Sequence, residues 1–268
     1  MDAIIRRALD EDLPDITTDS IFGPEERGSA HFIAKQRGVI AGLAVAARVF
    51  EHLDPNARFH PLVSEGDHVE PGTRIADLEA TVRALLSGER TALNMMQRAS
   101  GIATATRHYA GAVAGTRAKI LDTRKTAPGL RPLDKEAVAA GGGENHRFGL
   151  FDMILLKNNH IDRAGSIHGA ALRARRASMG RPIMIEVRDL VELEQALEEA
   201  PDFVLLDNMS IEMMTEAVRR TAGRTVLEAS GGISLESVRS VAETGVDRIS
   251  IGALTHSVTA LDISMRIV

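Results

Sequence analysis

Short apolar runs fill the chain from about residue 120 onward, and each run ends in a polar residue or glycine before an amphipathic stretch begins. Their near-continuous apolar character is typical of parallel strands that are buried on both faces. Stretches such as 190–199, 211–221 and 235–244 have the helical period of apolar positions instead. This part of the chain is therefore predicted to be a series of βα units. The strand-like runs are AKILDT, DMILLK, PIMIEV, FVLLDN, TVLEAS and RISIGA.

The spacing of these runs favours a barrel. Glu186, Asp207, Ser230 and Gly252 mark the last four runs, and they recur about every 22 residues, as the βα units of a (β/α) barrel do. Only six runs are evident, so the barrel is expected to be incomplete or to hide a strand within 126–150. A doubly wound open sheet is the alternative, weakened because no G-x-G-x-x-G follows the first run.

Residues 1–105 have a different pattern and are predicted to form an N-terminal α/β sandwich domain on an antiparallel sheet. Gly66 and Pro71-Gly72 are strong turn signals within it. A helical pattern that opens at Gly88 is taken as the connector to a barrel domain over 106–268, whose last residues are expected to return to the first domain. The expected early elements are a helix at 3–9, a turn-rich segment at 15–27, β-like runs at 31–35 and 38–41, and a helix at 43–53.

Composition narrows the functional classes. Hydrophobic residues make up 44% and charged residues 26% of the 268 residues, which is an ordinary globular balance. The net charge of -5 argues against a nucleic-acid surface. The absence of cysteine removes disulfides, thiolate nucleophiles and iron–sulfur clusters. No signal peptide and no apolar run of about 18 residues is present, so we expect a cytoplasmic protein without a membrane partner.

Polar residues gather where the predicted strands end. In a parallel barrel, the carboxyl ends of all strands face one mouth, so these side chains are expected to share a cavity. The mouth would hold both cations and carboxylates, which suits an anionic ligand; ion pairs that only stabilise the strand ends are the alternative. These residues are Arg124, Lys125, Lys157, Asn158, Glu186, Asp207, Asn208, Ser230 and Gly252.

Glycines follow the last two runs, as Ser230-Gly231-Gly232 and as Gly252 in a segment that ends at His256. Glycine lets backbone N–H groups approach an oxyanion, and the last two loops of such barrels often bind phosphate. Tight turns that need a positive φ are the alternative interpretation. The two loops together favour phosphate binding.

Three further chemistries follow from the cations and carboxylates. The planar guanidinium of Arg147, next to His146, can bind a carboxylate through two parallel hydrogen bonds, although a solvated surface arginine is the alternative. Lys125 or Lys157 could instead form a Schiff base with a carbonyl substrate, if desolvated. Glu186 with Asp207 suits a hard ion such as Mg²⁺. A lyase, a transferase and a non-catalytic anion-binding module therefore remain open from these residues alone.

The motifs, taken in order, resemble the quinolinate phosphoribosyltransferase family. They are D-T-R-K-T at 122–126, then P-G-L-R, G-G-G-x-N-H-R, K-x-N-H, L-D-N and S-G-G-I, and the resemblance covers nearly the whole chain. It implies an N-terminal α/β sandwich followed by an incomplete (β/α) barrel of the type II phosphoribosyltransferase kind. The implied reaction converts quinolinate and phosphoribosyl pyrophosphate (PRPP) into nicotinate mononucleotide, pyrophosphate and CO2, with Mg²⁺ and no organic cofactor, in NAD biosynthesis.

The resemblance also implies roles for individual residues and a homodimer in which the N-terminal domain of one chain caps the barrel of its partner. Met184 is a departure, because relatives often carry a glutamate in this position. The implied quinolinate-binding residues are Arg90, Arg124, His146, Arg147 and Lys157. The residues implied at the ribose and pyrophosphate are Lys125, Glu186 and Asp207, the last two with Mg²⁺. The implied phosphate loop comprises Ser230, Gly231, Gly232, Gly252 and His256.

Overall fold

Two sheets organise the chain in the computed structural model, which describes residues 1–268. The chain divides into two compact units, each assembled from separate segments. The first unit comprises 1–107, 126–142 and 254–268, and the second comprises 108–125 and 143–253. The boundary predicted near residue 105 lies within one continuous helix, α4 (Val82–Ala112).

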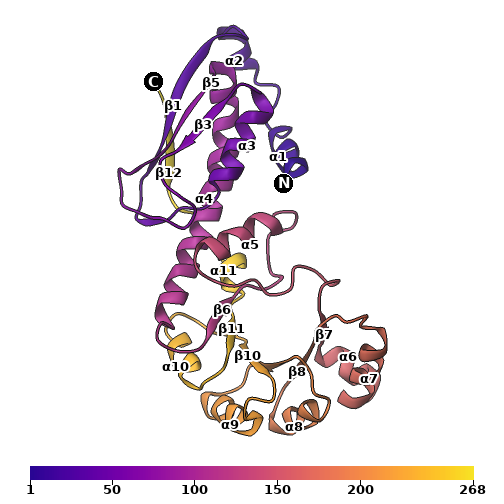
Figure 1. Ribbon diagram of the computed structural model, residues 1–268. Helices are drawn as coiled ribbons and strands as arrows, with labels where there is room; N and C mark the ends of the chain where they lie inside the picture. The colour runs from indigo at the N-terminus through magenta and orange to yellow at the C-terminus, as the bar shows by residue number, and fades with distance from the viewer. The chain divides into compact units, whose positions relative to one another are not determined.

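An antiparallel sheet with strand order β12-β1-β5-β3 forms the first unit, and Figure 1 shows α3 and α4 running beside it. Its last strand comes from the C-terminus and pairs with β1. The strands are β1 (Arg27–Ala34), β3 (Arg58–Pro61), β5 (Arg74–Thr81) and β12 (Ile263–Ile267), with a separate pair β2 (Gly38–Val39) and β4 (His68–Val69). The helices are α1 (Asp2–Leu9), α2 (Ile16–Ile21), α3 (Leu43–Leu53) and α5 (Arg131–Ala140).

Aromatic packing joins α3 to this sheet. Phe32 of β1 is fully buried, and its ring lies 6.2 Å from that of Phe50 in an edge-on arrangement. Phe59 of β3 packs on Phe32 at 5.6 Å. Such pairs add about 0.5–1.5 kcal/mol beyond the area that they bury.

A buried ion pair fixes α5 against α4 within the first unit. Arg98 donates from Nε and Nη2 to the two oxygens of Asp134, both at 2.8 Å, and the Asp134 side chain is fully buried. Gly141, at the end of α5, lies so close to α4 that a Cβ there would be 2.5 Å from the Ala103 carbonyl oxygen. The absence of a side chain at Gly141 therefore allows α5 to pack closely on α4.

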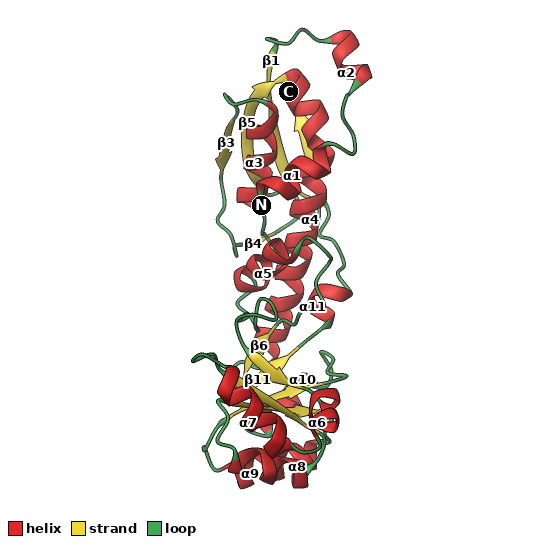
Figure 2. Ribbon diagram, turned by 90° about the vertical axis from the view of Figure 1, so that its right-hand side faces the viewer, coloured by secondary structure: helices red, strands yellow, loops and turns green.

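The second unit is a six-stranded parallel sheet with the order β6-β11-β10-β9-β8-β7. All six predicted strands are present, and β6 and β7 lie at opposite edges, so the barrel is incomplete, as expected. Figures 1 and 2 show α7, α8 and α9 on one side of this sheet. The strands are β6 (Lys119–Leu121), β7 (Ile154–Leu156), β8 (Ile183–Val187), β9 (Phe203–Asp207), β10 (Val226–Ser230) and β11 (Arg248–Ser250).

Side-chain caps start three of the six helices that come after β7 in the chain. Ser166, Asp189 and Ser210 each accept a hydrogen bond from a backbone N–H of the first turn of α7, α8 and α9. These short connections keep the strand ends close to the helix starts. The helices are α6 (Asn158–Ala164), α7 (Ile167–Ala177), α8 (Leu190–Glu198), α9 (Ile211–Thr221), α10 (Val238–Glu243) and α11 (Ala253–His256).

Two local expectations were wrong or incomplete. The segment predicted to be turn-rich contains the helix α2, whose first turn is capped by the Asp15 carboxylate at 3.0 Å from the Thr18 nitrogen. The connector helix begins at Val82 rather than at Gly88. Of the two options for the barrel, the incomplete one holds, because residues 126–150 contain α5 and a single parallel bridge between Leu121 and Glu144 but no strand. None of the helices is both long enough and apolar enough to cross a bilayer.

Candidate functional site

Strand register places several of the predicted site residues at the carboxyl ends of neighbouring strands of the parallel sheet. Ser230 pairs with Asp207 on one side and with Ser250 on the other, so β9, β10 and β11 end level with one another. Two residues earlier along β9 and β10, Leu205 pairs with Glu228 on one side and with Glu186 of β8 on the other. Side chains two residues apart on a strand share a face, so the carboxylates and the serine stand on the same side of the sheet.

Lys157 and Glu186 form a pair across the ends of β7 and β8. The lysine Nζ lies 3.7 Å from Glu186 Oε2, and the Asn158 backbone N–H donates to Oε1 at 3.4 Å. Glu186 is buried, whereas the Lys157 side chain is 53% exposed. A Schiff-base lysine has to be desolvated; Lys157 is hydrated and beside a carboxylate, which argues against that chemistry.

His146 is held at three points. Its backbone N–H donates to Asp122 Oδ1 at 2.8 Å, and its ring Nδ1 accepts a hydrogen bond from the backbone N–H of Arg147 at 2.7 Å. Its Nε2 lies 3.4 Å from Glu228 Oε1. Because the Arg147 N–H occupies Nδ1, the ring proton belongs on Nε2 and the imidazole is neutral. His146 is therefore not one of the cations of the site.

Arg147 and Arg124 lie close enough in the second unit for the charge of one to affect the other. Arg147 donates from Nη1 to the Met153 carbonyl at 2.9 Å, which fixes its guanidinium. Burial and then the charge of Arg124 lower the pKa of Arg147, while Asp152 acts in the opposite direction. Two guanidinium groups that lie close together repel each other and raise the local positive potential. A bound anion would reduce this repulsion. Lys125 follows Arg124 in the sequence, and its backbone N–H donates to Thr123 Oγ1 at 3.1 Å.

The loop after β10 has a backbone that only glycine adopts easily. Gly231 has a φ of +100° and Gly232 a φ of +60°. A Cβ on Gly231 would lie 2.2 Å from Asn208 Oδ1. Asn208 is itself in the left-handed region, and its backbone N–H donates to the Ser230 carbonyl at 2.9 Å. Gly231 is therefore required both by its positive φ and by the close approach of the Asn208 side chain, and phosphate binding by this loop stays a prediction.

Two of the predicted site residues lie in the first unit. Arg90, in α4, has a side chain that is 74% exposed, with Nη2 3.8 Å from Glu89 Oε1. His256, at the end of α11, has its Nδ1 2.7 Å from the Ser257 hydroxyl. Gly252 follows β11 in the second unit.

Glu228 and Asp122 are fully buried acidic residues that sequence reasoning did not select. Burial raises the pKa of Glu228 to about 7, the Ser250 hydroxyl and Arg248 oppose this rise, and Asp122 adds to it. The sequence did carry a signal, because Glu228 is a charged residue inside the apolar run TVLEAS. Only the fold shows that it faces His146.

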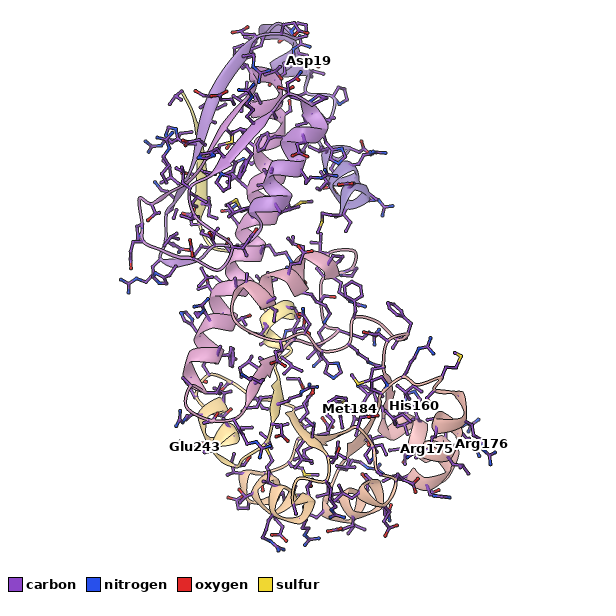
Figure 3. The ribbon with its side chains drawn as sticks, in the orientation of Figure 1. Asp19, His160, Arg175, Arg176, Met184 and Glu243 are labelled. Atoms are coloured by element: carbon purple, nitrogen blue, oxygen red, sulfur yellow. The ribbon has the colours of Figure 1, made fainter.

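Met184 fills the position where a carboxylate was expected in relatives. Figure 3 shows it within the curve of the parallel sheet. It is fully buried and packs with Leu155 and Leu205, with Met153 and Phe203 against them. The face of the sheet that carries Glu186 therefore also carries a buried apolar cluster.

Mg²⁺ would have few protein ligands here. The structure contains no group of three or more His, Asp or Glu side chains arranged to hold a metal. Glu186 and Asp207, on neighbouring strands, supply the carboxylate oxygens that Mg²⁺ accepts when substrate phosphates complete its shell. This donor set fits an ion that arrives with a phosphorylated substrate.

Comparisons with known proteins identify the family. Residues 15–100 match the N-terminal domain model, and residues 102–266 the C-terminal domain model, of quinolinate phosphoribosyl transferase. The probable nicotinate-nucleotide pyrophosphorylase (carboxylating) of Bacillus subtilis is 46% identical, over 94% of this chain and 87% of its own. Quinolinate phosphoribosyltransferase (decarboxylating) 1b of Nicotiana tabacum is 41% identical, over 98% of this chain and 81% of its own.

Solved structures show the same likeness. The NadC crystal structure from Streptococcus pyogenes has a TM-score of 0.95 and 39% identity, covering 100% of this chain and 96% of that one. The nicotinate-nucleotide pyrophosphorylase of Ehrlichia chaffeensis has a TM-score of 0.93 and 40% identity, covering 99% and 98%. The two domain models and the full-length relatives lead to one conclusion: this chain belongs to the quinolinate phosphoribosyltransferase family.

Proposed function

We propose that the protein transfers the phosphoribosyl group of PRPP to quinolinate and releases CO2, giving nicotinate mononucleotide and pyrophosphate for NAD biosynthesis. The observation that carries this function is the pair of neighbouring guanidinium groups, Arg124 and Arg147, in the same unit whose parallel strands carry Glu186 and Asp207 near their carboxyl ends. Guanidinium groups suit an anionic acceptor, and carboxylates suit a donor that becomes positive during transfer. The matched relatives carry this activity in their names.

Quinolinate has two carboxylates, and the proposed binding groups match both. Arg124 and Arg147 bind them, with Lys157 nearby and Arg90 supplied by a second chain. Arg147 suits this task because the Met153 carbonyl already fixes its plane. His146 contributes through the position of Arg147 rather than through a charge of its own.

Glu186 and Asp207 act on the donor. When the pyridine nitrogen attacks C1 and the bond to pyrophosphate breaks, positive charge develops on the ribose. A nearby carboxylate stabilises that charge, and Lys125 stabilises the departing pyrophosphate. Glu186 and Asp207 would hold Mg²⁺, which when bound would supply further positive charge for the pyrophosphate. Ser230, Gly231, Gly232, Gly252 and His256 are proposed to hold the 5′-phosphate.

Decarboxylation follows from the product of that step. The ribosylated nitrogen is cationic, so the electron pair left when CO2 departs from the neighbouring carbon is stabilised next to it. That carbon then takes up one proton. The protein's task is to orient the ring and exclude water, and the Met184 cluster lies on the face that would do so.

The test is product formation from quinolinate, PRPP and Mg²⁺, with nicotinate as the matched control substrate. We expect turnover of quinolinate and little or none of nicotinate, because loss of one charged contact costs about 2–5 kcal/mol. Comparable turnover of the two substrates would contradict the assignment. Borohydride should not trap a substrate on Lys125 or Lys157, as it would in a Schiff-base enzyme.

The cytoplasmic location of the protein stays a prediction.

A further inference from the structure

Glu228 is the least expected polar residue of the parallel sheet. It lies in the middle of β10 and is fully buried, and neither carboxylate oxygen makes a well-formed hydrogen bond. The Ser250 hydroxyl on the neighbouring strand donates instead to the Ala229 carbonyl, at 3.5 Å. A buried carboxyl in this state costs folding free energy, so the presence of Glu228 here needs an explanation other than stability.

The group that faces Glu228 is the imidazole of His146. Its Nε2 lies 3.4 Å from Oε1, and the tautomer fixed by the Arg147 N–H puts a proton on that nitrogen. The carboxyl is therefore placed to accept from Nε2–H, while Nδ1 accepts from the main chain. The ring therefore makes a hydrogen bond at Nδ1 and a longer contact with Glu228 at Nε2, and a flip of the ring would break both contacts.

The hydrogen bond between His146 Nδ1 and the Arg147 backbone N–H connects this pair to the proposed quinolinate site. The Nδ1 contact fixes the backbone nitrogen of Arg147, and the Met153 carbonyl fixes its guanidinium. Asp122, which is also fully buried, accepts from the His146 backbone N–H at 2.8 Å and anchors the same segment. The chain of contacts therefore runs from Glu228 through His146 to Arg147.

We propose that Glu228 is a positioning residue that sets the quinolinate affinity of Arg147 by holding the His146 ring in its Nε2–H orientation. Glu228 does not touch the substrate in this proposal, which rests on the proposed function for its kinetic consequence. Its structural consequence, an ordered Arg147 backbone, does not depend on any activity.

The decisive variants are Glu228→Met, which keeps the length but removes the acceptor, and Glu228→Gln, which keeps an acceptor. We expect Glu228→Met to raise the KM for quinolinate about tenfold and to leave the KM for PRPP within about twofold, since a buried N–H loses its partner. Glu228→Gln should keep the quinolinate KM within about threefold of wild type because the amide oxygen still accepts. Glu243→Gln, on the exposed face of α10 in the same unit, is the matched control and should change neither constant.

Hydrogen exchange separates this role from simple destabilisation and from failure of the proposed function. The Arg147 amide should exchange faster in Glu228→Met than in wild type and Glu228→Gln, while amides of β8 and β9 keep their protection. His146→Gln should show the same loss of Arg147 protection and the same KM split, which provides a second route if Glu228→Met does not fold. Unchanged Arg147 exchange, or equal rises in both KM values, would overturn the proposal. Absence of turnover in the wild type would refute the proposed function, and the exchange experiment would still decide the positioning role.

Discussion

At the scale of single residues, the proposed site contains side chains whose orientation is fixed by hydrogen bonds to the backbone. Arg147 shows this most clearly, because its backbone N–H is bonded to His146 and its Nη1 to the Met153 carbonyl. The sequence indicated an arginine beside a histidine but could not show that the histidine is neutral. That conclusion needs the position of one backbone N–H, which only the folded chain defines.

Arg147→Lys tests whether the planar fork matters. Lysine keeps the charge but cannot bind a carboxylate through two parallel bonds, so the KM for quinolinate should rise by at least about tenfold. The KM for PRPP should barely change. A similar rise for both substrates would indicate a general electrostatic role, and unchanged kinetics would remove Arg147 from the site.

Glu228 predicts a dependence of stability on pH. Its pKa rises from 4.5 to about 7 on folding, mainly because of burial. Below about pH 4.5 the carboxyl is protonated in both states, and as the pH rises toward 7 the unfolded chain loses its proton first. The folded state therefore loses stability over this window, and a neutral Glu228→Gln should gain relative to wild type by on the order of 3 kcal/mol.

The check is urea unfolding of wild type and Glu228→Gln at about pH 5 and about pH 8. The gap between the two proteins should widen at the higher pH. Parallel curves at the two pH values would show that Glu228 ionises equally easily in the folded and unfolded chains.

At the scale of elements, the six parallel strands were predictable and several other elements were not. Strands buried on both faces are short apolar runs, so β8 (Ile183–Val187) is conspicuous in the sequence, with all five residues buried. By contrast, β3 (Arg58–Pro61) contains no fully buried residue and left no such signal. The helix α2 is rich in Thr, Asp and Ser, which favour turns and caps over helix interiors, so tertiary context decided its structure.

The loop after β10 gives a prediction at this scale. In Gly231→Ala the new Cβ would be 2.2 Å from Asn208 Oδ1, so the loop or Asn208 has to move. We expect the KM for PRPP to rise by at least about tenfold, because backbone N–H groups that hold a phosphate tolerate little displacement.

Gly223→Ala is the matched control for this variant. Gly223 also has a positive φ, +77°, but nothing lies within 4 Å of an added Cβ. It therefore has the same kind of backbone strain without the collision. If both variants change the KM for PRPP equally, backbone strain in general and not the Asn208 contact would be the cause.

At the scale of the whole molecule, segments from distant parts of the sequence complete each unit. Residues 126–142 and 254–268 belong to the first unit, although both flank strands of the second in sequence. The hydrophobic period of a sequence indicates which residues are buried but not which sheet they join. The return of the C-terminal residues to the first unit was therefore predicted, but the place of residues 126–142 in that unit was not. The same limit applies to Arg90 and His256, which lie in the first unit while the other predicted site residues lie in the second.

We predict that Arg90 acts at the site of a partner chain in a homodimer. Its side chain is 74% exposed, and its ion pair with Glu89 is long, at 3.8 Å, so it remains available to a ligand outside its own unit. A ligand covered by a partner's first unit would also be shielded from water, which strengthens every charged contact around it.

Mixing two inactive variants, Arg90→Ala and Lys157→Ala, should therefore restore activity. Random exchange at equal amounts makes about half of the dimers mixed, each with one intact site of two, so recovery should approach about a quarter of wild type. Arg147→Ala mixed with Lys157→Ala is the control. Both residues lie in the second unit of one chain, so every site in every dimer lacks one of them and no activity should return. If subunit exchange is shown to be complete and the first mixture stays inactive, Arg90 acts in its own chain or has no role at the site.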